Sequence, residues 1–272
     1  MKKLVLLIGD TIIDKYVYLQ PTGFSLETPT VKCQKIKERQ ELGGAANVAI
    51  KMAMLGCEVD FITSVSESQR KILESTPGLN VICAAKRDQV KERFYLVKDE
   101  TYKYLQINDC EVISPDIVWP NSKTVPLYDT IVVSDYRLGV VSSQILKILP
   151  KNKTICQMQV SDSNEKISKY KGFHCYVGNR DEIPKENISE IHRHNKFDVC
   201  VATDGEKEII AYDGIEKINY TPKRAEGVND YHGAGDAFYA GFCTMYDGKN
   251  LRDAIMFGDT VAYDYLKRGE NV

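Results

Sequence analysis

Short apolar runs recur along the chain between polar and glycine positions, at lengths typical of buried strands. The runs that predict strands lie at residues 3–8, 59–63, 130–133, 154–160, 175–177 and 197–202. Small and apolar residues at helical spacing predict a helix over 44–55, ended by Gly56, and a second helix over 142–149. Because strands alternate with helices, we expect a mainly parallel sheet covered by helices on both faces.

Two regions interrupt this alternation and predict a second, smaller sheet. Residues 14–38 are rich in Tyr, Thr, Val and alternating charge, and residues 87–108 alternate polar and apolar positions around an expected turn at Asp99-Glu100. We therefore expect exposed antiparallel strands, approximately over 11–39 and 86–108, inserted in the core as a β-strand lid. No repeat, low-complexity tract or linker divides the chain, so residues 1–272 are interpreted as a single domain.

Composition narrows the range of partners. The chain carries 36 Lys and Arg against 38 Asp and Glu, a net charge of −2, which gives no electrostatic case for binding nucleic acid or an anionic membrane. The early apolar run from Leu4 to Ile8 is too short for a secretory signal or a bilayer span. Eight cysteines form no CxxC pair, and most lie in apolar runs, so we interpret them as free core thiols of a cytoplasmic protein.

The run NDYHGAGD at residues 229–236, followed by an apolar stretch, is the first candidate site. Gly233 and Gly235 allow a tight turn whose successive amides point into one concavity, and the helix expected to follow favours an anion at its N-terminus. Asp236 would lie at that mouth, where a carboxylate can take a proton from a hydroxyl that attacks phosphorus. The alternative is a glycine-rich turn in which Asp236 only caps a helix.

Three further motifs are weaker individually. GGAANVA at 43–49 combines small residues, which let a ligand approach closely, with Asn47, which can bond a hydroxyl; the alternative is a helix start packed tightly against a strand. Asn179 and Glu182 follow another apolar run and can hold Mg²⁺ through water, or form an ordinary helix start. Thr203-Asp204-Gly205 predicts either a nucleotide phosphate contact or only a turn.

The four motifs, in this order along nearly the whole chain, resemble the ribokinase/PfkB family of sugar and nucleoside kinases. GGAANVA and GAGDAF match its two signature regions, and NxxE and TxG fall where the family places its Mg²⁺ and nucleotide contacts. The resemblance implies a ribokinase-like three-layer α/β/α core with a small β-strand lid. It also implies an ATP- and Mg²⁺-dependent kinase that transfers the γ-phosphate to a hydroxyl of a sugar or sugar phosphate.

Several segments are similar to a narrower group, the bacterial heptose 7-phosphate kinases of ADP-heptose synthesis. The similar segments are GDTIIDKY at 9–16, ETPTV at 27–31, Glu38-Arg39, VKER at 90–93, SDYRLG at 134–139 and YKG at 170–172. This resemblance implies phosphorylation of the anomeric hydroxyl of a heptose 7-phosphate. Many members of the group are fused to a nucleotidyltransferase domain, which we do not expect within this length.

The family resemblance assigns roles residue by residue. The residues that would hold the sugar hydroxyls are Asp14, Gly43, Gly44 and Asn47. The transfer would use Asp236 as general base, with the amides of Gly233, Ala234 and Gly235 as an anion hole. Glu182 with Asn179 would organise Mg²⁺, and Thr203 with Gly205 would contact ATP. Lys91 and Arg93 would hold a sugar phosphate, unless they are solvated charges on the lid.

The chain also departs from the family pattern. Tyr231 and His232 stand where a small or β-branched residue usually precedes GAGD; a charged His232 would bind phosphate, and an ordinary loop histidine is the alternative. SDS at 161–163 replaces the Asp-Pro-Lys stretch of heptose kinases, and no Asn lies near Gly258-Asp259, on the helix expected beside adenine.

These departures keep two alternatives open. One is a PfkB kinase for another substrate, such as a ketose phosphate, ribose or a nucleoside. The other is a catalytically weakened protein that binds a sugar or nucleotide. In either case the partner is a small molecule, and because exposed lid strands present pairing edges, we also expect a homodimer through the lid.

Overall fold

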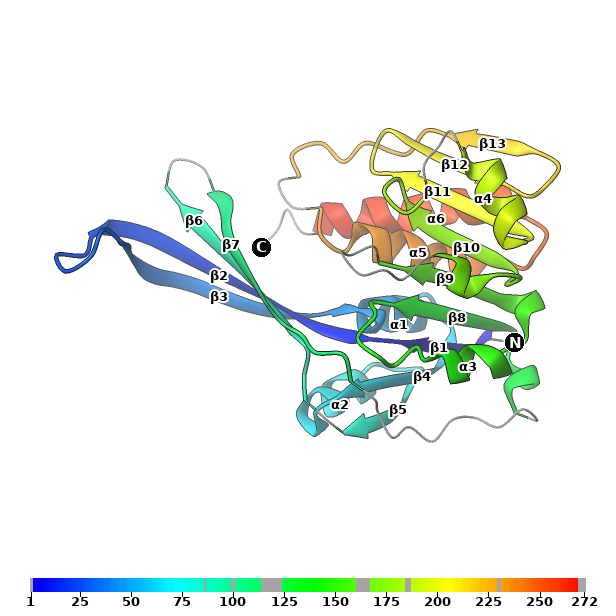
Figure 1. Cartoon of the computed structure of the whole chain (residues 1–272), viewed down its shortest axis with the longest axis horizontal. Coiled ribbons are helices and arrows are strands. Elements are labelled where there is room, and N and C mark those ends of the chain that lie inside the picture. The colour runs from blue at the N-terminus through cyan, green and yellow to red at the C-terminus, as the bar shows by residue number, and fades with distance from the viewer. Residues whose placement is uncertain are drawn as a thin grey trace.

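The computed structural model describes residues 2–85, 87–98, 101–113, 124–159, 167–183, 187–228 and 231–268. The strands of its main sheet are β1 (Leu4–Gly9), β4 (Glu58–Val65), β5 (Leu79–Ala85), β8 (Thr130–Asp135), β9 (Thr154–Met158), β10 (Cys175–Asn179), β11 (Val199–Asp204), β12 (Glu208–Tyr212) and β13 (Lys217–Tyr220). Within the described ranges these nine strands follow the order β13-β12-β11-β10-β9-β8-β1-β4-β5 (Figure 1). Neighbours from β5 to β11 pair in parallel, whereas β11, β12 and β13 pair antiparallel. The mainly parallel sheet predicted from the apolar runs is confirmed.

Helices cover both faces of this sheet. They are α1 (Ala45–Met54), α2 (Glu67–Glu74), α3 (Ser143–Ile148), α4 (Ile188–Asn195), α5 (Ala234–Met245) and α6 (Leu251–Arg268). Short 3₁₀ turns lie at Val125–Leu127, Lys151–Lys153 and Ile167–Tyr170. The helices predicted over 44–55 and 142–149 are α1 and α3, and Ser142 caps α3 by accepting from the Ile145 amide.

Alternate residues of each core strand enter two separate apolar clusters. Val5 and Leu7 of β1 pack with α1, α2, α5 and α6, whereas Leu6 and Ile8 pack with α3 and α4. All four side chains are fully buried. Because side chains alternate in direction along a strand, a continuous apolar run is what burial on both faces requires.

A second sheet projects from the core and is called the small sheet below. Its strands are β2 (Thr11–Phe24), β3 (Val31–Gly44), β6 (Val90–Val97) and β7 (Thr101–Asp109), in the order β3-β2-β6-β7. The β2–β3 and β6–β7 pairs are antiparallel hairpins, as expected, but the central pair β2–β6 is parallel. The sequence alternation fits either direction, because it records which face is buried and not which way the partner runs. The predicted turn at Asp99-Glu100 lies outside the described residues.

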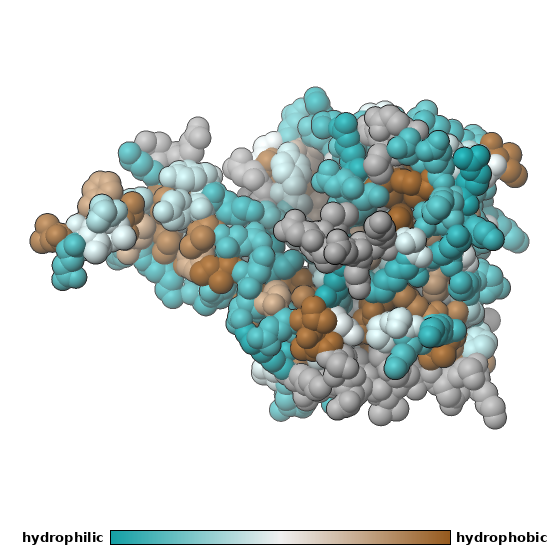
Figure 2. Space-filling model, in the orientation of Figure 1, coloured by the Kyte–Doolittle hydropathy of each residue, from teal (hydrophilic) through white to brown (hydrophobic). Residues whose placement is uncertain are grey.

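The small sheet carries many apolar side chains that face solvent (Figure 2). The large exposed ones are Phe24, Leu26, Val31, Ile36, Tyr102, Tyr104, Leu105 and Ile107. In Figure 1 the β2–β3 hairpin extends far from the core, with β6 and β7 alongside it. A projecting sheet of this composition is suited to contact with another protein surface.

Most cysteines lie in the core as free thiols, as the sequence predicts. Cys57, Cys156, Cys175, Cys200 and Cys243 are buried, and all eight thiols are free. Cys33 is the exception, because it lies exposed on β3 of the small sheet. In the part of the chain that the structure describes, no helix combines the length and apolar character needed to cross a bilayer.

Candidate active site

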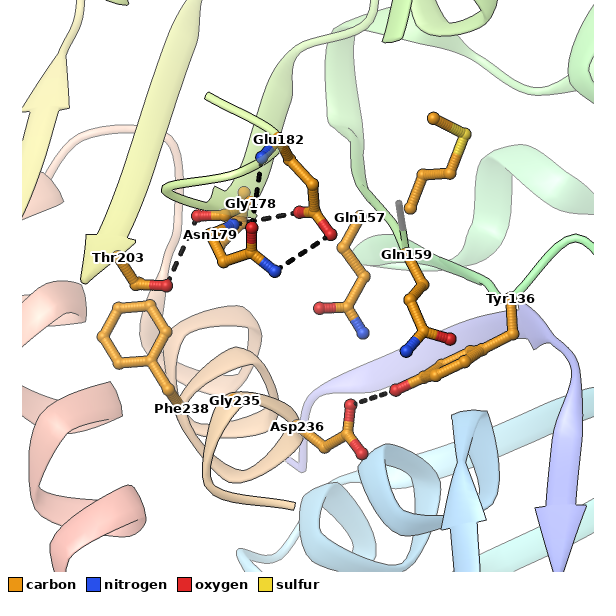
Figure 3. A pocket seen from close by; sticks show the side chains of 12 residues that line it. Tyr136, Gln157, Gln159, Gly178, Asn179, Glu182, Thr203, Gly235, Asp236 and Phe238 are labelled. Carbon is orange, nitrogen blue, oxygen red and sulfur yellow. Dashed lines mark hydrogen bonds between the residues drawn. The ribbon is translucent and has the colours of Figure 1, made fainter. Parts of the chain in front are cut away.

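The candidate site lies where the carboxyl ends of central strands meet the N-terminus of α5. A pocket of about 150 Å³ opens there, between the ends of β9, β10 and β11 and the first turn of α5 (Figure 3). The residues singled out by sequence that line this pocket are Asn179, Glu182, Thr203, Gly235 and Asp236. They come from distant parts of the chain, and they meet because parallel strands end at one edge of the sheet.

Asp236 occupies the first turn of α5. Its Oδ1 accepts a hydrogen bond from the Tyr136 hydroxyl at 2.6 Å, and the Asn47 Nδ2 lies 3.5 Å from its Oδ2. Burial raises the pKa of Asp236 to about 6, against the lowering effect of the bonds from Tyr136 and Asn47. At neutral pH the carboxylate is therefore ionised yet more basic than an ordinary Asp, which suits a proton acceptor.

Two features fix the start of α5 in place. Gly233 takes the left-handed N-cap position with φ of 79°, and a Cβ there would lie 2.6 Å from the Tyr265 hydroxyl, so a larger residue would be strained and would displace Tyr265. One turn after Asp236, the buried Tyr239 hydroxyl lies 3.0 Å from the Val133 carbonyl and 2.9 Å from that of Ile155. These bonds tie the helix to β8 and β9, so Asp236 has a rigid support.

The loop before α5 provides the expected glycine-rich turn, with one amide already bonded. The Ala234 amide donates to the Tyr231 carbonyl at 3.2 Å, and the Ala237 amide to the Gly233 carbonyl at 2.9 Å. Gly235 lines the pocket and has open space where a Cβ would lie. Tyr231 is half exposed and does not line the pocket.

Asn179 and Glu182 form a tight turn at the end of β10. The alternative of an ordinary helix start does not hold, since residues 180–182 form a turn. The Asn179 Oδ1 accepts from the amides of Asp181 (2.9 Å) and Glu182 (3.1 Å), while Glu182 accepts from the Asn179 amide at 2.9 Å and from its Nδ2 at 3.2 Å. These reciprocal bonds aim the Glu182 carboxylate into the pocket (Figure 3).

One carboxylate is a suitable protein ligand for Mg²⁺ beside a phosphate. Among the described residues no group of three or more His, Cys, Asp or Glu could enclose a metal ion. Mg²⁺ usually keeps several waters and takes one or two carboxylates together with substrate phosphates. Glu182 at the pocket wall, steadied by Asn179, therefore fits Mg²⁺ held largely through water.

The structure separates the two residues of the Thr203–Gly205 motif. Thr203 lines the pocket, and its Oγ1 donates to the Gly178 carbonyl at 3.3 Å. Gly205 lies in the turn between β11 and β12 with φ of 54° and is not among the residues that line the pocket. Beside it, Asp204 pairs with Arg180 at 3.4 Å and with Lys207 at 3.7 Å.

The residues expected to hold sugar hydroxyls lie on the other side of Asp236. Gly43 and Gly44 end β3, and a Cβ on Gly43 would lie only 2.0 Å from the Asp14 Oδ2. Gly44 has φ of 62°, and a Cβ there would meet the Asp10 carbonyl at 2.7 Å. The glycines therefore let β3 pass close to Asp14, and the following helix places Asn47 at Asp236.

Lys91 and Arg93 of β6 face this same region and are not solvated lid charges. Arg93 is 7% exposed and forms a short ion pair with Asp14. The Lys91 Nζ lies 3.4 Å from the Gln159 Oε1 at the pocket wall and 5.7 Å from the centre of the Tyr136 ring. Burial lowers the pKa of Lys91, partly offset by the carboxylates of Asp14 and Asp236.

Sequence reasoning missed Tyr136 and the two acids that hold its loop. Asp10 is buried at the end of β1 and accepts from the amides of Tyr136 (2.9 Å), Leu138 (3.2 Å) and Val140 (3.0 Å). Asp135 accepts from the Arg137 amide at 2.7 Å. The available signal was the run SDYRLG at 134–139, which was used only as a family resemblance.

The structure describes some of the departures from the family pattern. Asn229, Asp230 and the run 161–163 lie outside the described residues. Asp259 is buried on α6, where it accepts from the Tyr220 hydroxyl at 2.8 Å and from the Lys223 amide at 3.2 Å. Asp259, which lies where the family usually has an Asn, is therefore held by Tyr220 at the end of β13.

Comparison with known proteins agrees with this geometry. The family model described as pfkB family carbohydrate kinase matches residues 2–263. The bifunctional protein HldE of Aliarcobacter butzleri (strain RM4018) is 26% identical, over 95% of this chain and 60% of that protein. HldE of Campylobacter jejuni subsp. doylei is also 26% identical, over 89% of this chain and 56% of its own length. The chain thus spans less than two thirds of the curated relatives it matches.

Solved structures show the same fold at lower identity. The structure of Arabidopsis thaliana ribokinase complexed with ribose and ATP has a TM-score of 0.75 and 17% sequence identity, and covers 98% of this chain and 93% of its own. The ribokinase-like fold, with its layered core and a separate small sheet, is confirmed by this likeness.

Proposed function

The chain belongs to the pfkB family of carbohydrate kinases, and on that premise we propose that it phosphorylates the anomeric hydroxyl of a heptose 7-phosphate. Membership makes it an ATP-dependent sugar kinase; the acceptor and the residue roles are the proposal. The observation that carries the proposal is the position of Asp236. This basic carboxylate lies between a pocket lined by Glu182 and Thr203 and a second group formed by Asp14 and Asn47.

Asp236 acts as the general base. One of its oxygens takes the proton of the acceptor hydroxyl as that hydroxyl oxygen attacks the γ-phosphorus of ATP. The bond from phosphorus to the bridging oxygen breaks, and ADP leaves with the electron pair. Support comes from the raised pKa of about 6 and from the rigid first turn of α5, which fixes the distance between base and acceptor.

The pocket side of Asp236 receives the phosphates of ATP. Gly235 lines the pocket from the first turn of α5, and backbone amides at a helix N-terminus favour an anion. Thr203, at the end of β11, also lines this pocket and would contact the nucleotide. Glu182, steadied by Asn179, would hold Mg²⁺ through water, and the ion would neutralise charge on the phosphate oxygens.

Basic side chains on one face of the small sheet favour a phosphorylated acceptor over a neutral sugar. Tyr16 stands directly opposite both Arg39 and Arg93 in the strand register, so the three share a face. The Arg39 and Arg93 guanidinium carbons lie 3.9 and 5.5 Å from the centre of the Tyr16 ring. Lys91, two residues from Arg93, extends this cationic face to the edge of the pocket.

The identity of the sugar is the most specific part of the proposal. The segments at 9–16, 90–93 and 134–139 resemble heptose 7-phosphate kinases, and they contain Asp14, Lys91, Arg93 and Tyr136, which meet at the site. These segments support a heptose 7-phosphate within the wider class of sugar phosphates.

We also propose that the small sheet pairs with that of a second copy. Its exposed apolar residues, named above, lie on its strands or, for Leu26, in the β2–β3 connection, and among the described residues β3 and β7 are the edge strands of the sheet. Contact between two copies would remove both the edges and the apolar side chains from water.

An acceptor panel tests this function. ADP release is followed with ATP and Mg²⁺ over heptose 7-phosphate, fructose phosphates, free heptose and ribose. The proposal predicts fastest turnover with heptose 7-phosphate and little with the unphosphorylated sugars. Preference for ribose or a nucleoside would contradict the phosphorylated acceptor, and ligand-induced thermal stabilisation without any turnover would contradict catalysis.

A further inference from the structure

Tyr136 hydrogen-bonds Asp236, although neither of the two signature regions, GGAANVA and GAGDAF, contains it. Its phenol donates to the Asp236 Oδ1 at 2.6 Å, a short bond typical of a charged acceptor. Figure 3 shows the ring lying along the pocket beside Gln159, with the hydroxyl directed at Asp236. Burial and the neighbouring carboxylates raise the pKa of Tyr136 well above its ordinary value, so the phenol remains a donor at any working pH.

The backbone that carries Tyr136 is held on both sides by buried acids. Asp10 accepts three amide bonds from Tyr136, Leu138 and Val140, as described above. On the other side, Asp135 accepts from the Arg137 amide, from the Lys169 ammonium at 2.8 Å and from the Tyr170 hydroxyl. The loop is therefore anchored in the main sheet and in the segment before β10.

The loop also contains a strained residue. Arg137 has φ of 60°, a left-handed conformation that costs a non-glycine residue free energy and persists only where the surroundings impose it. A loop of this kind is unsuited to a gate that swings away when substrate enters. It is suited to holding a side chain at one place throughout the reaction.

We infer that Tyr136 is a positioning residue for the general base, holding one oxygen of Asp236 so that the other faces the acceptor hydroxyl. This inference rests on the proposed function of Asp236. The two oxygens are already distinguished in the structure. Oδ1 accepts the short bond from Tyr136, whereas the side-chain hydrogen-bond partner of Oδ2 among the described residues is Asn47, at a long 3.5 Å. Oδ2 is therefore the oxygen that takes the proton.

Other nearby charges also shift the pKa of Asp236. The groups that face it are Asn47 and Lys51 from α1, Asp14 from β2 and Lys91 from β6. Asp14 raises the pKa of Asp236 and Lys51 lowers it. Because the Tyr136 bond stabilises the charged carboxylate, removing it raises the pKa of Asp236 further, and the base is then protonated at a higher pH.

The test compares Tyr136→Phe with the parent and with Tyr128→Phe. Tyr128 also donates a phenol bond to a carboxylate, Asp60, but it precedes β8 at the opposite end of that strand. With the best acceptor, Tyr136→Phe should lower plateau kcat about tenfold and raise the acidic midpoint of the kcat profile by about one pH unit. The acceptor KM should stay within about twofold, and Tyr128→Phe should match the parent in kcat and midpoint.

A second readout needs no substrate. The urea unfolding free energy lost in Tyr136→Phe should be larger at pH 8 than at pH 5, because only the charged carboxylate receives the charge-assisted bond. An unmoved acidic midpoint, or a higher kcat in Tyr136→Phe, overturns the inference. Failure of the proposed function is separable, since in that case Asp236→Asn would retain turnover whatever Tyr136→Phe does.

Discussion

Replacing Asp236 with Asn should stabilise the fold at neutral pH. Burial raises the pKa of this carboxyl from its ordinary 3.8 to about 6, so the charged form costs the folded protein free energy relative to the unfolded chain. At about 1.4 kcal/mol per pH unit, the shift corresponds to about 3 kcal/mol. Because the side chain keeps some contact with water, we expect the variant to gain about 2 kcal/mol at pH 7.5.

The sign of the pH dependence follows from the same shift. The folded protein binds more protons than the unfolded chain between about pH 4 and pH 6, so this penalty disappears as pH falls through that window. Urea unfolding at pH 7.5 and pH 4.5 measures the effect, with Asp264→Asn on the exposed face of α6 as the control. A variant no more stable than the parent at pH 7.5 would refute the reasoning, since it would mean that Asp236 is not held in a desolvated site.

Three further predictions concern residues of the small sheet. Arg93→Met should lower the free energy of unfolding in urea by about 3 kcal/mol, because it leaves the partly buried Asp14 without its cation. The double variant Arg93→Met with Asp14→Asn should lose less stability than the sum of the two single variants. A fully additive double variant would show that the pair is not coupled. Lys91→Gln should raise KM for a sugar phosphate about tenfold or more while changing KM for the free sugar little; equal changes would remove Lys91 from phosphate binding. Sedimentation at micromolar concentration should give a dimer that Tyr104→Lys on β7 converts to monomer, whereas a parent that is already monomeric contradicts pairing through the small sheet.

Much of the core was predictable because its sequence signal is local and strong. The runs at Leu4–Ile8 and Val199–Ala202 are continuous because both faces of the strands are buried, and that requirement is visible in the residues themselves. Gly43 and Gly44 were predictable for a similar reason. A side chain at either position would collide with Asp14 or the Asp10 carbonyl, so only glycine permits the close approach.

The parts that were not predictable depend on contacts between distant segments. Nothing local to Asp10 indicates that it holds the backbone of residues 136–140, and nothing in the alternation of β2 and β6 indicates that they pair in parallel. The alternative of a helix start at Asn179 does not hold because Asn179 and Glu182 satisfy each other's bonds within a turn, which uses the same residue types as a capped helix start. Lys91 and Arg93 look like solvated strand charges until the sheet folds onto Asp14 and Tyr136.

The most direct test of the central claim is turnover by Asp236→Asn. ADP release with ATP, Mg²⁺ and the best sugar phosphate is measured for the parent and the variant at pH 8, where Asp236 with a pKa of about 6 is ionised. If Asp236 is the general base, the variant should lose about 10³-fold or more in kcat while its urea unfolding stays cooperative and its acceptor KM changes little. Turnover within about tenfold of the parent would contradict the assignment and move the proton acceptor to another group.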